Sequence, residues 1–162
     1  MAHAEVDDPA VVVDAAARFL EARPRSIAEV RRRLVGAGYR QDLVEGAIGR
    51  LVELGILDDA AFGRWWIGSR DRARPRGERA LRSELAAKGV DRAVVEAVLE
   101  EREVTRPDVD ASAARRLLER HASALARIAD PRARRQRAYS LLARHGFDAD
   151  LAGSLVRSLD EP

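Results

Sequence analysis

The residue type in this chain that could carry a chemical function is arginine, whose guanidinium group binds anions. Each guanidinium presents a planar fork of N–H donors that forms paired hydrogen bonds with a phosphate or a carboxylate. Residues 62–92 hold nine basic and four acidic side chains, which makes this stretch the first candidate for such a role. We expect the main binding surface at Arg70, Arg72, Arg74, Arg76, Arg79, Arg82 and Lys88.

The spacing of three of these arginines favours one shared face. Arg76, Arg79 and Arg82 are three residues apart, which in a helix places them within an arc of about 120°. Pro75 and Gly77 interrupt the helical pattern just before, so residues 70–77 are expected to form a flexible loop. Such a surface suits phosphate groups or a carboxylate-rich protein groove. The alternative interpretation is a solvated face in an arginine-rich chain.

A second basic stretch spans residues 111–147, with nine basic and two acidic side chains. Its arginines scatter around the predicted helix, and we select Arg132, Arg135 and Arg144 as a second patch. Acidic stretches at 1–23 and 93–110 alternate with the basic ones, although the net charge is only +2. This alternation of charge indicates a polyanionic partner.

The other side chains with catalytic or ligating groups do not form a recognisable site. His3, His121 and His145 lack the spacing of metal ligands, and we expect solvated side chains. Asp58 and Asp59 could be paired carboxylates for acid–base chemistry, but acids at the start of a helix are expected to cap it. No glycine-rich nucleotide loop is found. We therefore predict no catalytic residue, no metal, no cofactor and no enzymatic activity.

Composition restricts the class of protein further. Of the 162 residues 46% are hydrophobic and none is cysteine, so the chain can build a core but not a disulfide framework. The first residues carry acids, and no uncharged stretch of about 18 residues follows, so neither a signal peptide nor a membrane span is expected. We predict a cytoplasmic protein without a membrane partner.

Helix-boundary signals predict an all-α fold. Only 4% of the residues are aromatic, whereas helix-favouring Ala, Leu, Arg and Glu dominate. Asp8-Pro9 and Asp130-Pro131 each supply an N-cap and a proline at the first helical position. Ser26 and Glu29 have the spacing of a capping box, so three helix starts are predicted.

Four helix ends share one pattern, in which a leucine is followed four residues later by a glycine and then by an apolar residue. The glycine suits the left-handed position after a helix, and the apolar residue can pack on the leucine. Asp91 and Asp148 are expected to cap the helices that follow two of these corners, and Asp42 to cap the helix after another. The four corner glycines are Gly38, Gly55, Gly89 and Gly146.

The corners also reveal an internal repeat. Gly38, Gly89 and Gly146 are separated by 51 and 57 residues, and the surrounding apolar positions recur with them. About nine helices are predicted, with single helices at 91–102 and 110–129, so three tandem three-helix repeats should form an elongated, curved array. The predicted segments are a flexible N-terminus at 1–8, repeats at 9–57, 58–102 and 110–162, and a joint at 103–109.

The middle of the sequence resembles the RecX family. One motif runs Gly55-Ile56-Leu57-Asp58-Asp59, Phe62, Trp66-Ile67 and Ser69-Arg70. A second runs Gly77, Leu81, Glu84-Leu85 and Lys88-Gly89-Val90. The segment from Ser26 to Tyr39 and the corner at Gly146-Phe147 extend the similarity over about residues 10–159.

The resemblance implies a regulator of homologous recombination. RecX-like proteins bind the RecA filament on single-stranded DNA, lie in its groove and depress ATP hydrolysis, strand exchange and co-protease activity. For this chain the implied partners are the RecA filament, single-stranded DNA and, weakly, duplex DNA, in the context of DNA repair and the SOS response. We expect a monomer, because the repeats can cover one another.

Two other functions fit parts of the pattern. A helix-turn-helix-like protein could bind DNA without RecA, since each glycine corner resembles that motif. Against it, residues 41–54 and 91–102, which follow two corners, are acidic or apolar. A purely structural helical scaffold is the third possibility, and it predicts that neutralising the arginines changes nothing.

Overall fold

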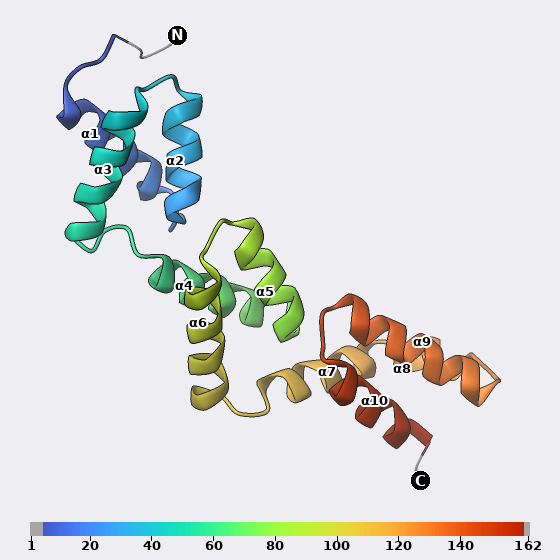
Figure 1. Cartoon of the computed structure of the whole chain (residues 1–162). Helices are drawn as coiled ribbons and strands as arrows, with labels where there is room; N and C mark the ends of the chain where they lie inside the picture. The colour runs from blue at the N-terminus through green and yellow to red at the C-terminus, as the bar shows by residue number, and fades with distance from the viewer. Residues whose placement is uncertain (1–4, 161–162) are drawn as a thin grey trace. The chain divides into compact units, whose positions relative to one another are not determined.

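The computed structural model describes residues 5–160, and every regular element in that range is helical (Figure 1). The predicted all-α fold is therefore confirmed. The helices are α1 (Pro9–Glu21), α2 (Ile27–Gly36), α3 (Gln41–Glu53), α4 (Asp59–Ala73), α5 (Glu78–Ala87), α6 (Arg92–Thr105), α7 (Val109–Arg120), α8 (Ala122–Ala126), α9 (Pro131–Arg144), α10 (Ala149–Arg157) and the 3₁₀ helix η1 (Ser158–Asp160).

The contacts divide the chain into two compact units. The N-terminal unit contains Met1–Trp66 and Leu85–Val98, and the C-terminal unit contains Ile67–Glu84 and Leu99–Pro162. In the N-terminal unit α1, α2 and α3 pack together (Figure 1). Val44, Ile48 and Leu51 follow helical spacing on α3, so one face of that helix supplies much of the core.

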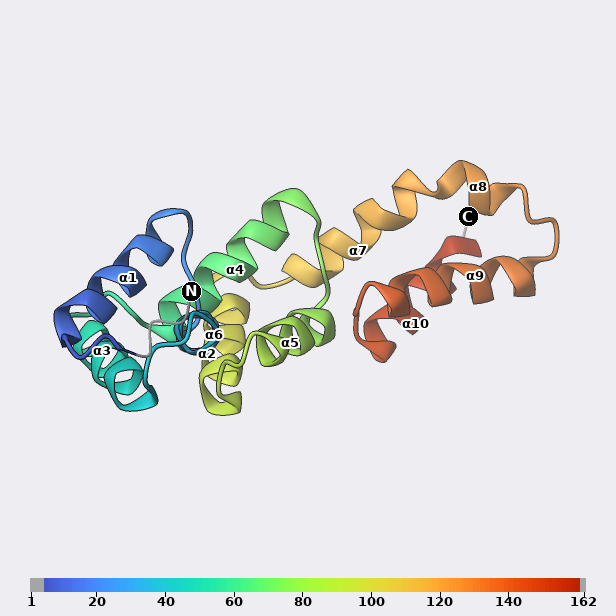
Figure 2. The same ribbon diagram turned by 90° about the horizontal axis from the view of Figure 1, so that it is seen from above.

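The C-terminal unit has its own core. Helix α9 contacts α7, α8 and α10, and Figure 2 shows α9 and α10 lying next to each other. Leu142 and Phe147 are almost completely buried there, and alanines such as Ala114 and Ala152 let the helices approach closely. This core is therefore built from small residues together with a few large ones.

The predicted helix starts are confirmed. Asp8 and Asp130 accept hydrogen bonds from backbone N–H groups of the first turns of α1 and α9. Ser26 and Glu29 form the capping box of α2. Asp148 caps α10, and Asp91 accepts from the backbone N–H of Ala93.

The cap predicted at Asp42 is wrong. Helix α3 already begins at Gln41, after Arg40, so Asp42 lies in the first turn and no side chain caps the helix. The carboxylate of Asp42 instead pairs with the Arg40 guanidinium at 2.7 Å. Arg40 also pairs with Asp7 at 2.6 Å.

All four corner glycines adopt the left-handed conformation, with φ of 93° at Gly38, 69° at Gly55, 77° at Gly89 and 81° at Gly146. The apolar residue after each glycine donates its backbone N–H to the carbonyl of the predicted leucine, at 2.9–3.3 Å. These bonds are the six-to-one bonds of the Schellman motif. The corner pattern is therefore confirmed at all four sites.

The helix predicted over 110–129 is wrong in its middle. The chain leaves the helical conformation at His121, which separates α7 from α8. The His121 ring Nδ1 lies 2.9 Å from the Leu117 carbonyl, and the His121 backbone N–H bonds to Leu118 instead. The ring thus takes the place of the N–H that a continuing helix would supply. Helix α6 also continues to Thr105, beyond the predicted end at 102.

Within each unit, the start of one helix docks on a glycine corner far along the chain. In the N-terminal unit Ser26 Oγ donates to the Lys88 carbonyl at 2.6 Å, and Ala28 faces Gly89 so closely that a Cβ on the glycine would overlap it. In the C-terminal unit Gly77 N donates to the His145 carbonyl at 2.9 Å. The corner there is Gly146, which faces Ala80 in the same way.

A carboxylate adds a further hydrogen bond to each of these two docked helix starts. Asp59 accepts a hydrogen bond from the backbone N–H of Ile27 at 2.9 Å, and Asp110 accepts one from Glu78 at 2.8 Å. Ile27 and Glu78 are the first residues of α2 and α5, and both pairs are separated by 32 residues. The two units thus contain the same docking contact, which agrees with an internal repeat.

This contact predicts unequal costs for two glycine substitutions. Gly146→Ala should lower the free energy of unfolding by about 3 kcal/mol, because left-handed strain and overlap with Ala80 add. Gly55→Ala should cost only about 1–2 kcal/mol, because Gly55 has the same conformation but faces open space. Urea unfolding followed by circular dichroism measures both values, and equal losses would contradict the docking role.

Candidate functional site

The arginine-rich stretch is more ordered than its sequence suggests. Helix α4 continues through Ala73, so Arg70 and Arg72 are helical, and only residues 74–77 connect α4 to α5. Arg76 lies in this connection and not on α5, so the predicted row of three arginines on one helix is wrong. The expectation of a flexible loop over 70–77 is also wrong for its helical part, and Gly77 is hydrogen-bonded to His145.

Three of the seven predicted residues are exposed. They are Arg72, Arg74 and Arg79, and none of them forms an ion pair with another residue in the range 5–160. All three are in the C-terminal unit. Their guanidinium groups are the ones that remain available for an anionic partner.

The other four cations are half-buried and paired. Arg70 Nε lies 2.8 Å and Arg76 Nε 3.7 Å from the Glu84 carboxylate, so one acid holds two guanidinium groups. Arg82 pairs with Glu78 at 2.5 Å on the same helix. These ion pairs fix the positions of the side chains and reduce their availability for a partner.

Lys88 belongs to the N-terminal unit and is also held in place. Its Nζ lies 3.3 Å from Glu29 Oε1 and 4.9 Å from the centre of the Trp66 ring. Glu29 additionally accepts from Arg23 at 2.9 Å and from the backbone N–H of Ser26 at 3.0 Å. Burial alone would raise the pKa of Glu29, but the hydrogen bonds and the charges of Arg23 and Lys88 outweigh burial and lower the pKa.

The second predicted patch lies on α9, where Arg132, Arg135 and Arg144 are all exposed. Arg132 and Arg135 are three residues apart and share one side of the helix. Arg144 follows Arg135 by nine residues, which places it on about the opposite side of the helix. The helix therefore brings two of these three arginines together.

One acid in the arginine-rich stretch points inward. Asp71 has a side chain only 6% exposed, and it pairs with Arg102 at 2.9 Å and also contacts Arg106. Arg102 is equally buried and pairs with Asp110 at 2.8 Å. Because Asp71 is satisfied inside the protein, it does not neutralise the exposed Arg72 and Arg74. Sequence reasoning missed this cluster, since no local pattern distinguishes Arg102 from the surface arginines.

The aspartate pair has two structural roles. Asp58 accepts from the backbone N–H groups of Ala60 and Ala61, so the expected capping is confirmed for this residue. Asp59 instead accepts the hydrogen bond from the backbone N–H of Ile27, and burial raises the pKa of Asp59. Within residues 5–160, no three Asp, Glu, His or Cys side chains are placed to share a metal ion.

The two described histidines act as helix caps. His121 and His145 each place ring Nδ1 2.9 Å from a carbonyl four residues earlier, at the ends of α7 and α9. His121 is exposed, as expected, whereas His145 is half-buried, so the expectation of a solvated side chain is wrong for His145. His3 lies outside the described residues. None of the described helices is both long and apolar enough to cross a membrane.

Sequence comparison identifies the family. Models of the first and second three-helix domains of RecX match residues 13–51 and 58–99, which fall on α1–α3 and α4–α6. The regulatory protein RecX of Mycobacterium avium is 36% identical over 143 residues, covering 86% of this chain and 79% of the relative. The chain belongs to the RecX family. The RecX of Thermobifida fusca is 34% identical over 140 residues, covering 86% of this chain and 74% of the relative.

Solved structures of RecX share the fold. The crystal structure of RecX from Lactobacillus salivarius superposes with a TM-score of 0.78 at 20% identity, covering 95% of this chain and 97% of that one. A second crystal structure of RecX gives a TM-score of 0.81 at 18% identity, with 93% and 71% coverage. The predicted resemblance to RecX is therefore confirmed by sequence and by fold.

The buried cluster predicts a large difference between two arginines that contact the same acid. Arg102→Met should lower the free energy of unfolding by about 3–5 kcal/mol, because it removes the buried cation that Asp71 and Asp110 share and leaves only the exposed Arg106 beside Asp71. Arg106→Met should cost less than about 1 kcal/mol, because the Arg106 side chain is 51% exposed. Urea unfolding compares the two, and similar losses would contradict the assignment.

The lowered pKa of Glu29 predicts a pH-dependent contribution to stability. Ionised Glu29 stabilises the fold at neutral pH, and this contribution is lost as the pH falls from about 4.3, the ordinary value, through the lowered pKa. Glu29→Gln should therefore be about 1–2 kcal/mol less stable than the parent at pH 7 and nearly equal at pH 2.5. Glu53→Gln, at an exposed glutamate, is the control and should match the parent at both pH values. A constant deficit across the pH range would contradict the prediction.

Proposed function

We propose that this protein binds the RecA filament on single-stranded DNA and inhibits its ATPase, strand-exchange and co-protease activities by occupying the filament groove. Membership of the RecX family supports the choice of partner. The observation that carries the mode of action is the exposure of Arg72, Arg74 and Arg79 without internal ion pairs. The proposal requires no catalytic residue and no cofactor, and it places the protein in the cytoplasm, where RecA acts.

The arginines have different roles in this proposal. Arg72, Arg74 and Arg79 contact carboxylates of RecA or phosphates of the bound DNA, since a guanidinium can pair with either. Arg70, Arg76 and Arg82 border these side chains in the sequence and are held by Glu84 and Glu78. Lys88 supports the N-terminal unit through Glu29. Arg132, Arg135 and Arg144 add a second anion-binding patch.

Binding by occupancy follows from the chemistry of the surface. Guanidinium groups hold anions but supply no nucleophile or proton acceptor at neutral pH. A protein bound in the groove through several such contacts would hinder the movements of neighbouring RecA subunits and the access of a second DNA strand. One chain acting as a monomer is sufficient for this effect.

The alternative of a sequence-reading helix-turn-helix protein is less well supported. Such proteins place base-reading side chains on the helix after the turn. The helices after the three repeat corners are α3, α6 and α10, and their basic residues are few: Arg50 on α3, Arg92 and the buried Arg102 on α6, and Arg157 on α10. Weak DNA binding by this chain is therefore assigned to phosphate contacts.

The decisive experiment is a titration of RecA's DNA-dependent ATPase with this protein. The parent should inhibit at stoichiometric amounts, and inhibition should weaken at higher salt because exposed ion pairs are screened. The triple variant Arg72→Glu, Arg74→Glu, Arg79→Glu should need at least about tenfold more protein for half-inhibition. Exposed substitutions cost little stability, so the variant should remain folded.

A matched control reverses three exposed arginines elsewhere. Arg18→Glu, Arg32→Glu, Arg127→Glu makes the same change in net charge, and it should inhibit nearly as well as the parent. If both triple variants lost inhibition equally, the site would be refuted and only overall charge would matter. If the parent itself left the ATPase unchanged at low salt, the function would be refuted.

A further inference from the structure

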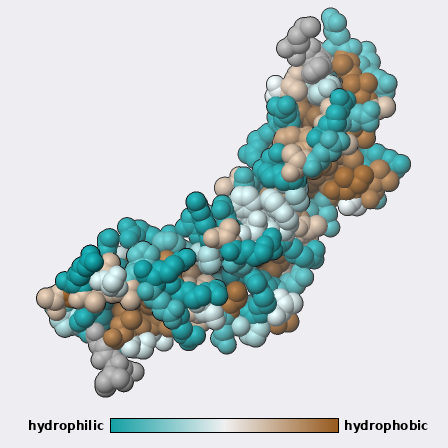
Figure 3. Space-filling view, turned by 180° about the vertical axis from the view of Figure 1, so that it is seen from behind, coloured by the Kyte–Doolittle hydropathy of each residue, from teal (hydrophilic) through white to brown (hydrophobic). Residues whose placement is uncertain are grey.

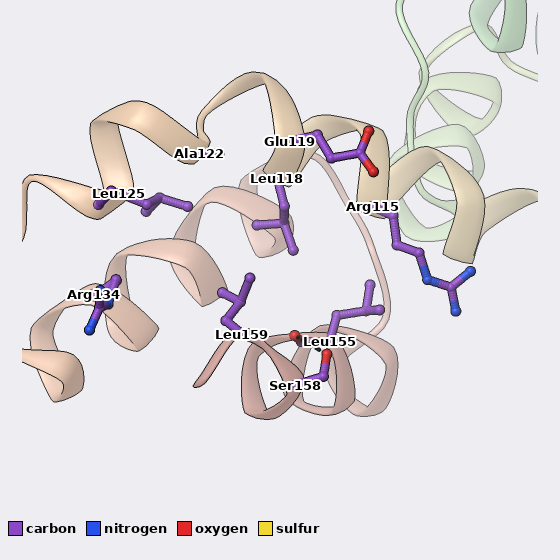
Figure 4. Close-up of a pocket in the computed structure, with 10 residues that line it drawn as sticks. Arg115, Leu118, Glu119, Ala122, Leu125, Arg134, Leu155, Ser158 and Leu159 are labelled. Carbon is purple, nitrogen blue, oxygen red and sulfur yellow. Dashed lines mark hydrogen bonds between the residues drawn. The ribbon is translucent and has the colours of Figure 1, made fainter. Parts of the chain in front are cut away.

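The C-terminal unit contains a hollow of about 380 Å³ that the proposed function does not use (Figure 4). It is bordered by α7, α8, the C-terminal part of α10 and η1, and α9 contributes Arg134 to its lining. None of the residues chosen above for RecA or DNA binding lines it. Its described lining residues are Arg115, Leu118, Glu119, Ala122, Leu125, Ala126, Arg134, Leu155, Ser158 and Leu159.

The walls of the hollow are apolar. The side chains of Leu118, Leu125, Leu155 and Leu159 converge on the same space in Figure 4. Helix α8 contributes Ala122 and Ala126 to the lining, and these short side chains leave space in front of them. An apolar cavity of about 150 Å³ already holds a benzene ring, so this hollow has room for one or two large apolar side chains.

An arginine side chain lies at each of two ends of the hollow. Figure 4 places Arg115 and Arg134 on opposite sides of the converging leucines. The surrounding stretch 111–147 has nine bases and two acids, and one of the acids, Glu119, stands at the rim. A ligand that fits this arrangement carries an apolar group in the middle and negative charge on both sides.

Protein fits this description better than nucleic acid. The described lining residues include no aromatic side chain on which a base could stack, and the Glu119 carboxylate repels a continuous row of phosphates. A protein segment can place single carboxylates beside the two arginines and avoid Glu119. Apolar anchors in pockets, surrounded by charge complementarity, are the common form of peptide recognition.

We propose that this hollow is a docking site for an acidic protein segment that inserts a leucine or phenylalanine between Leu118, Leu125 and Leu155. One carboxylate of that segment lies against Arg115, and another lies beside Arg134, which already makes a contact within the chain. The site is separate from the anion-binding arginines of the proposed RecA surface, so it can serve a different contact of the same partner or a different protein.

The probe for this site is a fluorescein-labelled peptide of twelve residues, with leucine and phenylalanine four positions apart and glutamates at most other positions. Fluorescence anisotropy with the full chain should detect saturable binding. A peptide with both apolar residues replaced by alanine should bind at least about tenfold more weakly, because the anchor is lost. Methyl NMR spectra should show shifts at Leu118, Leu125 and Leu155 when the first peptide binds.

Two kinds of variant separate the hollow from general charge. Ala122→Leu with Ala126→Leu fills the space and should weaken binding at least about tenfold, with unchanged helicity as the folding check. Arg115→Glu is an exposed change and should weaken binding about tenfold. Arg120→Glu is the matched control, because Arg120 is exposed on α7 and does not line the hollow, and it should bind like the parent.

Three results would overturn the proposal. The first is equal binding of the peptide with alanines, since the anchor would then be irrelevant. The second is full displacement of the peptide by a single-stranded oligothymidine that itself shifts the same leucine methyl signals, since the occupant would then be nucleic acid. The third is unchanged binding by Arg115→Glu, which keeps the test decisive even if the filled variant fails to fold.

Discussion

The docking of a helix start on a glycine corner is the constraint on which the rest of this structure depends. The corner needs a left-handed residue, and the docked backbone needs the space that a side chain would take, so glycine is required twice at the same position. At Gly89 and Gly146 both conditions hold, whereas Gly55 meets only the first. The contact also gives a partner to a backbone N–H group at the docked helix start, which has none within its own helix. The acceptor is Asp59 in one unit and Asp110 in the other.

The same contacts partition the charges between the inside and the surface. Asp110 accepts a hydrogen bond from the start of α5 and also pairs with the buried Arg102. Arg102 in turn pairs with Asp71. Acids of the arginine-rich stretch are thereby used up in the interior or in half-buried pairs, and the exposed arginines keep their positive charge. Figure 3, which is coloured by hydropathy, shows hydrophilic side chains over much of one face and separate apolar patches among them.

Local signals in the sequence were sufficient for the fold and insufficient for the site. Caps, corners and the spacing of repeats act over a few residues, and they predicted the helices at Asp8, Ser26 and Gly146 correctly. The availability of an arginine depends on residues far away or on a side chain's direction, so the pairing of Arg70 and Arg76 with Glu84 could not be read from spacing. The break at His121 was missed for a related reason, because a ring nitrogen replaced a backbone donor without any glycine or proline.

The start of α9 differs chemically from the starts of α2 and α5. Helix α9, which follows α7 and α8, begins with Pro131, and proline has no backbone N–H. Ile27 and Glu78, at the matching positions of α2 and α5, each donate that N–H to an aspartate of the docked segment. The Asp130 side chain already accepts hydrogen bonds from the next two backbone N–H groups of α9, those of Arg132 and Ala133. The start of α9 therefore lacks the N–H donor through which the starts of α2 and α5 bind an aspartate.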